Sequence, residues 1–315
     1  MWVQDFLVCD TRSFTSVFAS TCENVRIGFA RLKFAERGEI MRWSDQRPSD
    51  NVEDRRGMGG RGIAVGGGGI GVLLLALVIY LCGGDPSQLL QSPSTNAGVP
   101  ASNSVPNKPV SQDQNAQFMR AVMGNLEDAW KQILPQQGRV AFRAPKLVLF
   151  SGQVSSACGY ASAAIGPFYC PGDSKLYLDF TFFDELKREF KAPGDFAQAY
   201  VIAHEFGHHI QNLTGTMGKV QSAGENKRLS VALELQADCY AGIWANFAAK
   251  QGRVDAGDAE EAVRAAAAVG DDMIQKRTQG YVVPDSFTHG SSQQRIQYFT
   301  TGLKTGDMRQ CQTIR

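Results

Sequence analysis

A stretch without charge, from Gly62 to Gly84, constrains this chain of 315 residues more than any other feature. Its sequence, GIAVGGGGIGVLLLALVIYLCGG, is about as long as a helix must be to cross the core of a bilayer. Glycine is tolerated in membrane helices, so the glycine run does not argue against a span. We therefore expect residues 62–84 to form a single transmembrane helix. The alternatives are the core of a signal peptide or a buried helix.

Several arginines lie shortly before this stretch, whereas the first cation after it is Lys108. The positive-inside rule then places residues 1–61 in the cytoplasm and the chain after Gly84 outside. This predicts an inner-membrane, single-pass protein whose main domain lies in the periplasm or another extracytoplasmic space. The preceding cations are Arg42, Arg47, Arg55, Arg56 and Arg61.

The regions on either side of the stretch differ in character. Residues 1–40 show no clean periodicity, and we interpret Met41 as the true start, with a short cytoplasmic tail as the alternative. Residues 85–115 are rich in Pro, Ser, Asn and Gln, which predicts a flexible linker. The folded domain is expected over residues 116–315, long enough for one core. With 32 basic and 31 acidic side chains, the chain gives no reason to expect nucleic acid as a partner.

Periodicity within this domain predicts an α+β fold, with a small sheet followed by helices. The helix after Pro193 has an apolar stripe and ends before Gly215. The last predicted helix begins at Asp258, with Glu261 completing a capping box. The predicted helices are 115–134, 195–214, 228–250 and 258–276, and the strands are 146–150 and 175–180.

Three of the chain's four histidines lie in the segment AHEFGHHIQN, residues 203–212. His204, Glu205 and His208 form the pattern H-E-x-x-H, which on a helix places both imidazoles on one face. Zinc binds imidazole nitrogen readily and keeps a position for water in catalytic sites. Glu205 can then exchange a proton with that water, as general base and acid. His209 points to another side of the helix, and we do not expect it to be a ligand.

The next predicted helix offers two carboxylates in the segment LELQAD. Glu234 can complete a site of two histidines and one glutamate. Asp238, one turn later, can accept a hydrogen bond from a liganding histidine and fix its tautomer. The alternative is an acidic stripe on a solvated face. Acids in so apolar a helix are unfavourable unless they are paired or metal-bound, which favours the ligand interpretation.

The fourth histidine, His289, lies in the segment PDSFTHGSSQQR. Hydrolysis of an amide needs a donor for the oxyanion that develops on the carbonyl. His289 is the candidate for this catalytic role, with Tyr281 or Arg295 as possible helpers. The alternative is a histidine on a surface loop.

These segments together resemble the neutral zinc metallopeptidase family of membrane-tethered bacterial proteins. The resemblance rests on HEFGHHIQN, ELQADCYAG and PDSFTHGSSQQR, on NVEDRRG and on the glycine-rich stretch, and it runs from Met41 to the C-terminus. It implies a zincin-like domain behind one transmembrane helix, with a gluzincin-like zinc site. That site would consist of His204, His208 and Glu234, with Glu205 as the catalytic acid and base.

Four of the seven cysteines lie in the domain expected outside the cytoplasm, where disulfides can form. Cys158 and Cys170 flank a short loop and are expected to pair. Cys239 and Cys311 would then tie the C-terminal tail to the helix that carries Glu234. Buried free thiols are the alternative.

We therefore expect a membrane-anchored zinc endopeptidase that hydrolyses protein or peptide substrates with a zinc-activated water. By analogy with zincins, the strand at 175–180 would pair with an extended substrate. Two alternatives stay open. One is a zinc-stabilised binding or scaffold module without turnover, and the other is a zinc amidase that acts on cell-wall material.

Overall fold

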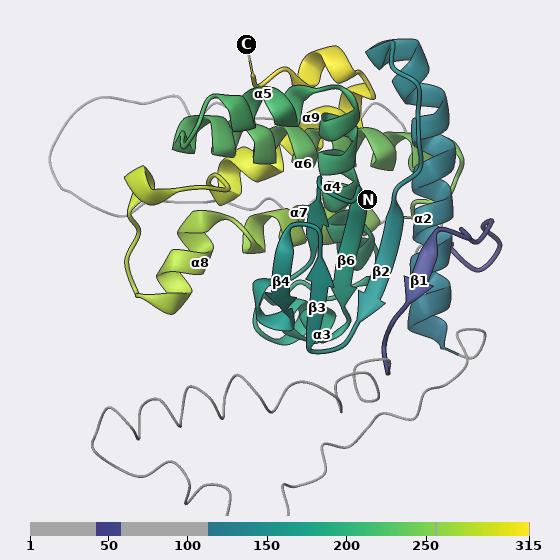
Figure 1. The fold of residues 1–315 in the computed structure, drawn as a ribbon, viewed down its shortest axis with the longest axis horizontal. Coiled ribbons are helices and arrows are strands. Elements are labelled where there is room, and N and C mark those ends of the chain that lie inside the picture. The colour runs from purple at the N-terminus through teal and green to yellow at the C-terminus, as the bar shows by residue number, and fades with distance from the viewer. Residues whose placement is uncertain (1–41, 58–112, 256, 315) are drawn as a thin grey trace, which may run out of the picture. The chain divides into compact units, whose positions relative to one another are not determined.

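The computed structural model describes residues 42–57, 113–255 and 257–314. These residues form a four-stranded sheet, a separate hairpin and a set of helices (Figure 1), which confirms the predicted α+β class. The helix predicted over residues 62–84 lies outside the described ranges. Within those ranges, no helix combines the length and the apolar character that a membrane crossing requires.

The four-stranded sheet has the order β1-β2-β6-β5. Its first three strands are parallel, and β5 runs antiparallel to β6. Because β6 lies between β2 and β5, its backbone is already paired on both sides, so the prediction that this strand binds substrate is wrong. The strands are β1 (Val52–Asp54), β2 (Lys146–Phe150), β5 (Phe168–Cys170) and β6 (Lys175–Asp179), and the hairpin consists of β3 (Gln153–Ser156) and β4 (Gly159–Ser162).

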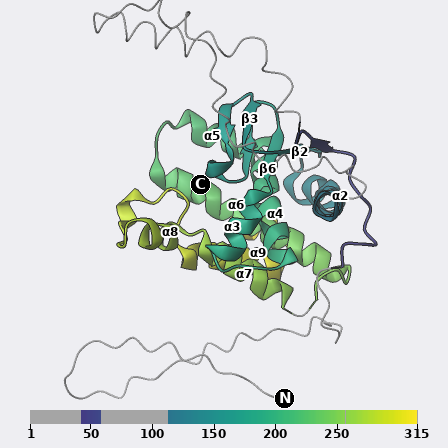
Figure 2. The same cartoon turned by 90° about the horizontal axis from the view of Figure 1, so that it is seen from below.

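The longer helices follow the predicted bounds closely. In both views α4, α6, α7 and α9 lie close together (Figures 1 and 2), and α6 packs against α4 and α9. The α-helices are α2 (Gln114–Ile133), α3 (Thr181–Arg188), α4 (Asp195–Leu213), α5 (Thr216–Ser222), α6 (Lys227–Lys250), α7 (Asp258–Ala268), α8 (Asp271–Thr278) and α9 (Ser292–Thr305). Short helical turns are η4 (Leu134–Gly138), η5 (Ala163–Ile165), η6 (Pro284–Ser286) and η7 (Met308–Cys311).

Helix α4 forms because an apolar stripe repeats at helical spacing, and the whole stripe is buried. This burial fixes which face of α4 meets the core and which face carries its histidines. Helix α2 begins earlier than predicted, since Asp113 caps it by accepting from the backbone N–H groups of Asn115 and Ala116. The buried residues of the α4 stripe are Phe196, Ala199, Ala203, Phe206 and Ile210.

The helix predicted over residues 258–276 is interrupted at Gly270, where the backbone becomes extended. The Asp271 carboxylate instead accepts from the His289 N–H in the loop before α9, and the Asp272 carboxylate accepts from the Ser292 N–H at the start of α9, which holds the start of α8 there. The predicted capping box is also wrong. Asp258 is the first residue of α7 rather than its cap, and the Glu261 carboxylate accepts from the Phe196 backbone N–H.

Residues 42–57 are part of the same folded unit as residues 113–314. Strand β1 pairs with β2 in the register Val52 to Leu147. Arg47 donates to the buried carboxylate of Glu127 at 2.9 Å. The chain here passes so close to α2 that a Cβ on Gly124 would lie 2.0 Å from the Arg47 carbonyl oxygen. The expectation that the folded domain comprises only residues 116–315 is therefore wrong for this segment.

Candidate metal centre

Two helices bring the predicted metal ligands together. Helix α4 carries His204 and His208 one turn apart, and α6 carries Glu234 (Figure 1). The helices approach closely because Gly207 has no side chain: a Cβ there would lie 2.9 Å from the Ala237 carbonyl oxygen. This contact sets the spacing between the imidazoles on α4 and the carboxylate on α6.

One ligand atom from each of His204, His208 and Glu234 lies within 4.8 Å of the others. The Nε2 atoms of His204 and His208 lie 3.1 and 3.3 Å from the two Glu234 oxygens. Tetrahedral zinc with bonds of about 2.0–2.1 Å separates its ligand atoms by about 3.3 Å. The donor set and its spacing therefore fit zinc.

The other nitrogen of His204 is held by a buried charged cluster. Asp238 Oδ1 lies 2.9 Å from His204 Nδ1, and Asp238 has no exposed surface. Arg295 donates to both Asp238 oxygens, at 2.8 and 2.9 Å, and Tyr200 donates to Oδ1 at 2.5 Å. Asp238 thus lies where the sequence placed it. The Arg295 guanidinium is engaged with Asp238 and also lines the cleft that contains the ligands, so its help to the oxyanion stays a prediction.

His208 has a neutral partner that the sequence did not indicate. Gln211 Oε1 lies 2.8 Å from His208 Nδ1. Gln211 is three residues further along the same helix and has no exposed surface. A glutamine three residues after a histidine is common on helices, so only the structure identifies Gln211 as the partner of His208. With Nδ1 of both histidines bonded to acceptors, both Nε2 atoms are left for a metal.

Glu205 lies on the wall of a cleft of about 550 Å³ that also contains the three ligands. Burial raises the pKa of its carboxyl, against the opposing effect of the two histidines. Pro167, Phe168 and Phe182 line the apolar side of the same cleft. Strand β5, one of the two edge strands of the sheet, contributes Phe168 to this lining.

His289 also lines this cleft, and its side chain is half exposed. Asp271 lies 3.1 Å from its Nδ1 atom and accepts from the backbone N–H groups of residues 288–290. This hydrogen bond to Asp271 raises the pKa of His289. Tyr281 does not line the cleft and is exposed on the loop after α8.

His209 is directed away from the ligands, as expected. Its Nε2 atom lies 2.7 Å from the Arg143 carbonyl oxygen, and its Nδ1 atom lies 3.1 Å from the Tyr169 hydroxyl. Burial lowers the pKa of His209 to about 4. Its neutral imidazole therefore ties α4 to the loop before β2 and to β5.

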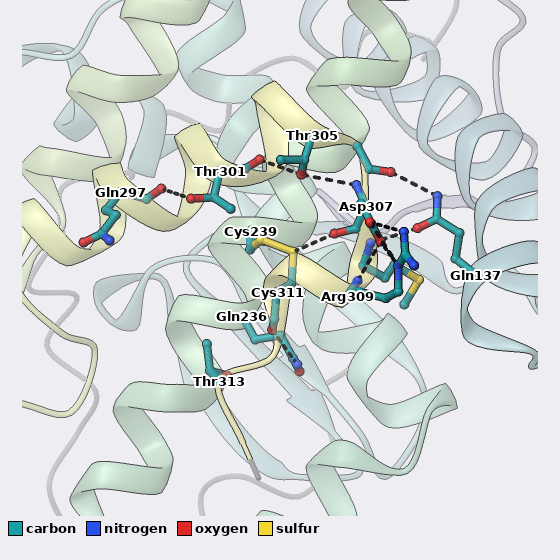
Figure 3. The surroundings of a disulfide bond; sticks show 12 residues. Gln137, Gln236, Cys239, Gln297, Thr301, Thr305, Asp307, Arg309, Cys311 and Thr313 are labelled. Carbon is teal, nitrogen blue, oxygen red and sulfur yellow. Dashed lines mark hydrogen bonds and ion pairs between the residues drawn. A yellow bond between two sulfur atoms is a disulfide. The ribbon is translucent and has the colours of Figure 1, made fainter. Parts of the chain in front are cut away.

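Both predicted disulfides are present. Cys158–Cys170 joins the β3–β4 turn to the end of β5. Cys239–Cys311 joins α6 to the C-terminal turn η7 (Figure 3). Cys239 directly follows Asp238, so this second bridge is attached close to the metal-binding residues.

Comparison with known proteins places the chain among proteins from distant bacteria. The uncharacterized protein YpfJ of Escherichia coli K12 is 44% identical over 290 residues, which cover 87% of this chain and 99% of that protein. The uncharacterized protein Rv2575 of Mycobacterium tuberculosis H37Rv is 46% identical over 204 residues, or 61% of this chain and 68% of that protein. No solved structure matches the chain. Residues 41–314 match the family described as "Putative neutral zinc metallopeptidase", and the chain belongs to this family.

Proposed function

We propose that the protein is a zinc-dependent endopeptidase with a zincin-like catalytic domain. The observation that carries this proposal is the convergence of His204, His208 and Glu234 beside Glu205 in one cleft. A purely structural zinc site is closed by four protein ligands and needs no base. Here three ligands and an unligated carboxylate share a cleft that is open to substrate.

When bound by these three residues, zinc supplies a Lewis acid that polarises a water molecule and the scissile carbonyl. Glu205 takes a proton from the attacking water and passes it to the departing amine nitrogen. Asp238 and Gln211 hold the two imidazoles in the tautomer that directs Nε2 into the cleft. His289, protonated and held by Asp271, donates from Nε2 to the developing oxyanion.

We infer that the peptide substrate binds along β5. This strand pairs with β6 along one edge, and no other strand of the described residues pairs with its second edge. An extended peptide pairing with that edge would gain backbone hydrogen bonds with little dependence on its sequence. Phe168 on this strand and Phe182 on α3 line the cleft and would contact apolar side chains.

The test compares Glu205→Gln with the wild type for bound zinc and for hydrolysis of an unfolded protein such as casein. Glu185→Gln is the matched control, because Glu185 lines the same cleft but lies on α3. We expect zinc in all three proteins and turnover only in the wild type and the control. Zinc without turnover in the wild type would favour a binding module, and cleavage of cell-wall fragments in place of casein would favour an amidase.

We further propose that the catalytic domain lies outside the cytoplasm. Two disulfides support an oxidising compartment. Because β1 pairs with β2, residues 42–57 must share that compartment. A chain that crosses the membrane once between residues 57 and 113 would put these two parts on opposite sides, so we drop both the cytoplasmic assignment of residues 42–57 and the single crossing.

Cysteine labelling tests this shared compartment in whole cells. Asp50, whose side chain is 98% exposed, and the exposed Glu225 are each replaced by cysteine in a chain whose three other cysteines, Cys9, Cys22 and Cys82, are serine. A maleimide that cannot cross the inner membrane should label both positions. Labelling at Glu225→Cys but not at Asp50→Cys, in a folded protein, would overturn the proposal.

A further inference from the structure

The two histidines of the metal site are held in different ways. His204 is bonded to a carboxylate that is itself paired with Arg295. The Nδ1 atom of His208 is bonded to the neutral amide of Gln211. An amide can present either its oxygen or its nitrogen, so something must fix which end of Gln211 faces His208.

The partners of the Gln211 nitrogen fix that orientation. Gln211 Nε2 donates to the Leu233 carbonyl oxygen at 2.7 Å and to Gln236 Oε1 at 3.2 Å. Both partners accept, so the Gln211 oxygen must face His208. His208 Nδ1 must then carry its proton, and the lone pair is left on Nε2, the atom beside Glu234.

The side-chain amide of Gln236, which is further from the metal site, also needs a partner that fixes its orientation. It is 3% exposed, and its Nε2 donates to the Cys311 carbonyl oxygen at 3.0 Å (Figure 3). A backbone carbonyl can only accept. The Cys311 carbonyl therefore orients Gln236, and Gln236 acts together with the Leu233 carbonyl to orient Gln211 toward His208. These hydrogen bonds form a series from Cys311 through Gln236 and Gln211 to His208.

The position of Cys311 is itself fixed by a covalent bond. Its sulfur is bonded to Cys239, three residues after Gln236 on α6 (Figure 3). Thr313 donates to the Ala232 carbonyl oxygen at 2.6 Å and holds the following residues along the same helix. The carbonyl at the end of the series is thus attached to the helix that carries Glu234.

We propose that the disulfide-anchored C-terminal segment, residues 307–313, is a positioning element for the metal ligand His208. Its Cys311 carbonyl supports the His208 tautomer through Gln236 and Gln211, in addition to the direct contact of Gln211 with the Leu233 carbonyl. This inference rests on the metal site of the proposed function and adds to it a role for the C-terminus. Outer partners of this kind typically change metal affinity by about 10–100-fold.

The test measures the zinc dissociation constant by competition with a chromophoric chelator, on the full chain in mild detergent. Gln211→Met should weaken zinc binding by about 10–100-fold. Gln236→Met should weaken it by about tenfold, the lower end of that range, because Leu233 still binds Gln211. Gln211→Glu keeps an acceptor for His208 while losing both donated bonds, so it should retain affinity even though its apo form unfolds more easily.

Gln137→Met is the matched control. Gln137 also binds the C-terminal segment, through the Gly306 carbonyl and the Met308 N–H, but it is not part of the series to His208 (Figure 3). This variant should keep wild-type zinc affinity. Replacing Cys239 and Cys311 together by serine should weaken zinc binding in the same direction as Gln236→Met.

Two outcomes would overturn the inference. One is a wild-type zinc affinity in Gln236→Met with a lower apo unfolding temperature, because the glutamine would then only stabilise the fold. The other is an equal loss of affinity in Gln137→Met. Zinc affinity does not depend on turnover. A wild type that binds zinc without cleaving casein would therefore contradict the peptidase proposal but not the role of the C-terminal segment. A wild type without zinc would overturn both.

Discussion

His289 is held in the cleft by a carboxylate far from it in sequence. Asp271 binds its Nδ1 atom and the backbone on both sides of it, so the ring is fixed although it lies on a loop. Asp271 raises the pKa of His289, with the more distant Glu234 acting in the same direction. The protonated ring can donate from Nε2, whereas the neutral ring with a proton on Nδ1 cannot.

A pH prediction follows from this pair. If protonated His289 stabilises the oxyanion, kcat/KM falls as the pH rises through its pKa. Asp271→Asn removes the carboxylate that raises this pKa, so the falling limb should move to lower pH. His289→Gln should lower kcat/KM by about 10²–10³-fold while bound zinc is unchanged. A falling limb that stays in place in Asp271→Asn would contradict the role given to His289.

Sequence reasoning found the residues whose chemistry depends on local spacing. His204, Glu205 and His208 follow from one helical turn, and the carboxylates of α6 stand out because their neighbours are apolar. Gln211 and Asp271 could not be found in this way. A glutamine carries no charge that must be explained, and Asp271 meets His289 only because the chain turns between α8 and α9.

At the scale of elements, α7 begins among acids rather than with a capping box. Asp258 is 5% exposed, and its carboxylate accepts from the Asp255 backbone N–H. Burial, together with the nearby charges of Glu261, Asp255 and Asp195, raises the pKa of Asp258 to about 7. The spacing of Asp258 and Glu261 suggested a cap, but tertiary contacts give both side chains other partners.

Asp258 should make the stability of the protein depend on pH. Its folded-state pKa of about 7 lies above its unfolded value of about 3.9, so only the folded state holds this proton between those values. Stability should therefore fall as the pH rises from about 4 to 7. Asp258→Asn should remove this part of the slope and raise the free energy of unfolding at pH 8 by roughly 2 kcal/mol, about half of what the pKa shift alone corresponds to, because solvent screens part of the charge.

Urea unfolding at pH 5 and pH 8 measures the difference between Asp258→Asn and the wild type. Asp184→Asn, an exposed acid in the first turn of α3, is the control and should leave the slope unchanged. An Asp258→Asn variant with the same pH slope as the wild type would show that Asp258 titrates normally.

At the scale of the molecule, the domain includes a segment that the sequence assigned elsewhere. Helix and strand periodicity identified α2, β2, β6, α4 and α6 because each has its own apolar pattern. Strand β1 has three residues, Val-Glu-Asp, and no such pattern. Its partner β2 begins at Lys146, far from β1 in the sequence. Only the tertiary fold therefore reveals the pairing.

Removal of this segment should destabilise the domain. Without it, the Glu127 carboxylate on α2 loses its hydrogen bonds to Arg47, Ser49 and Asn51. Hydrogen bonds to a charged group contribute about 1.5–3 kcal/mol, and a loss of this size corresponds to a fall in Tm of roughly 5 °C for a domain of this size. A chain that begins at residue 112 should therefore melt below one that begins at residue 42. A synthetic peptide of residues 42–57 should restore part of the loss, and equal melting temperatures would contradict the assignment.

The proposed function depends on the binding of one zinc ion by His204, His208 and Glu234. The most direct measurement is the zinc content per chain, at submicromolar free zinc, of the wild type, His208→Gln and His209→Gln. These adjacent histidines are both buried, but only His208 belongs to the ligand cluster. We predict one zinc per chain in the wild type and in His209→Gln, and a loss of zinc with its hydrolytic activity in His208→Gln. Equal zinc in all three proteins, or zinc lost only from His209→Gln, would contradict the site.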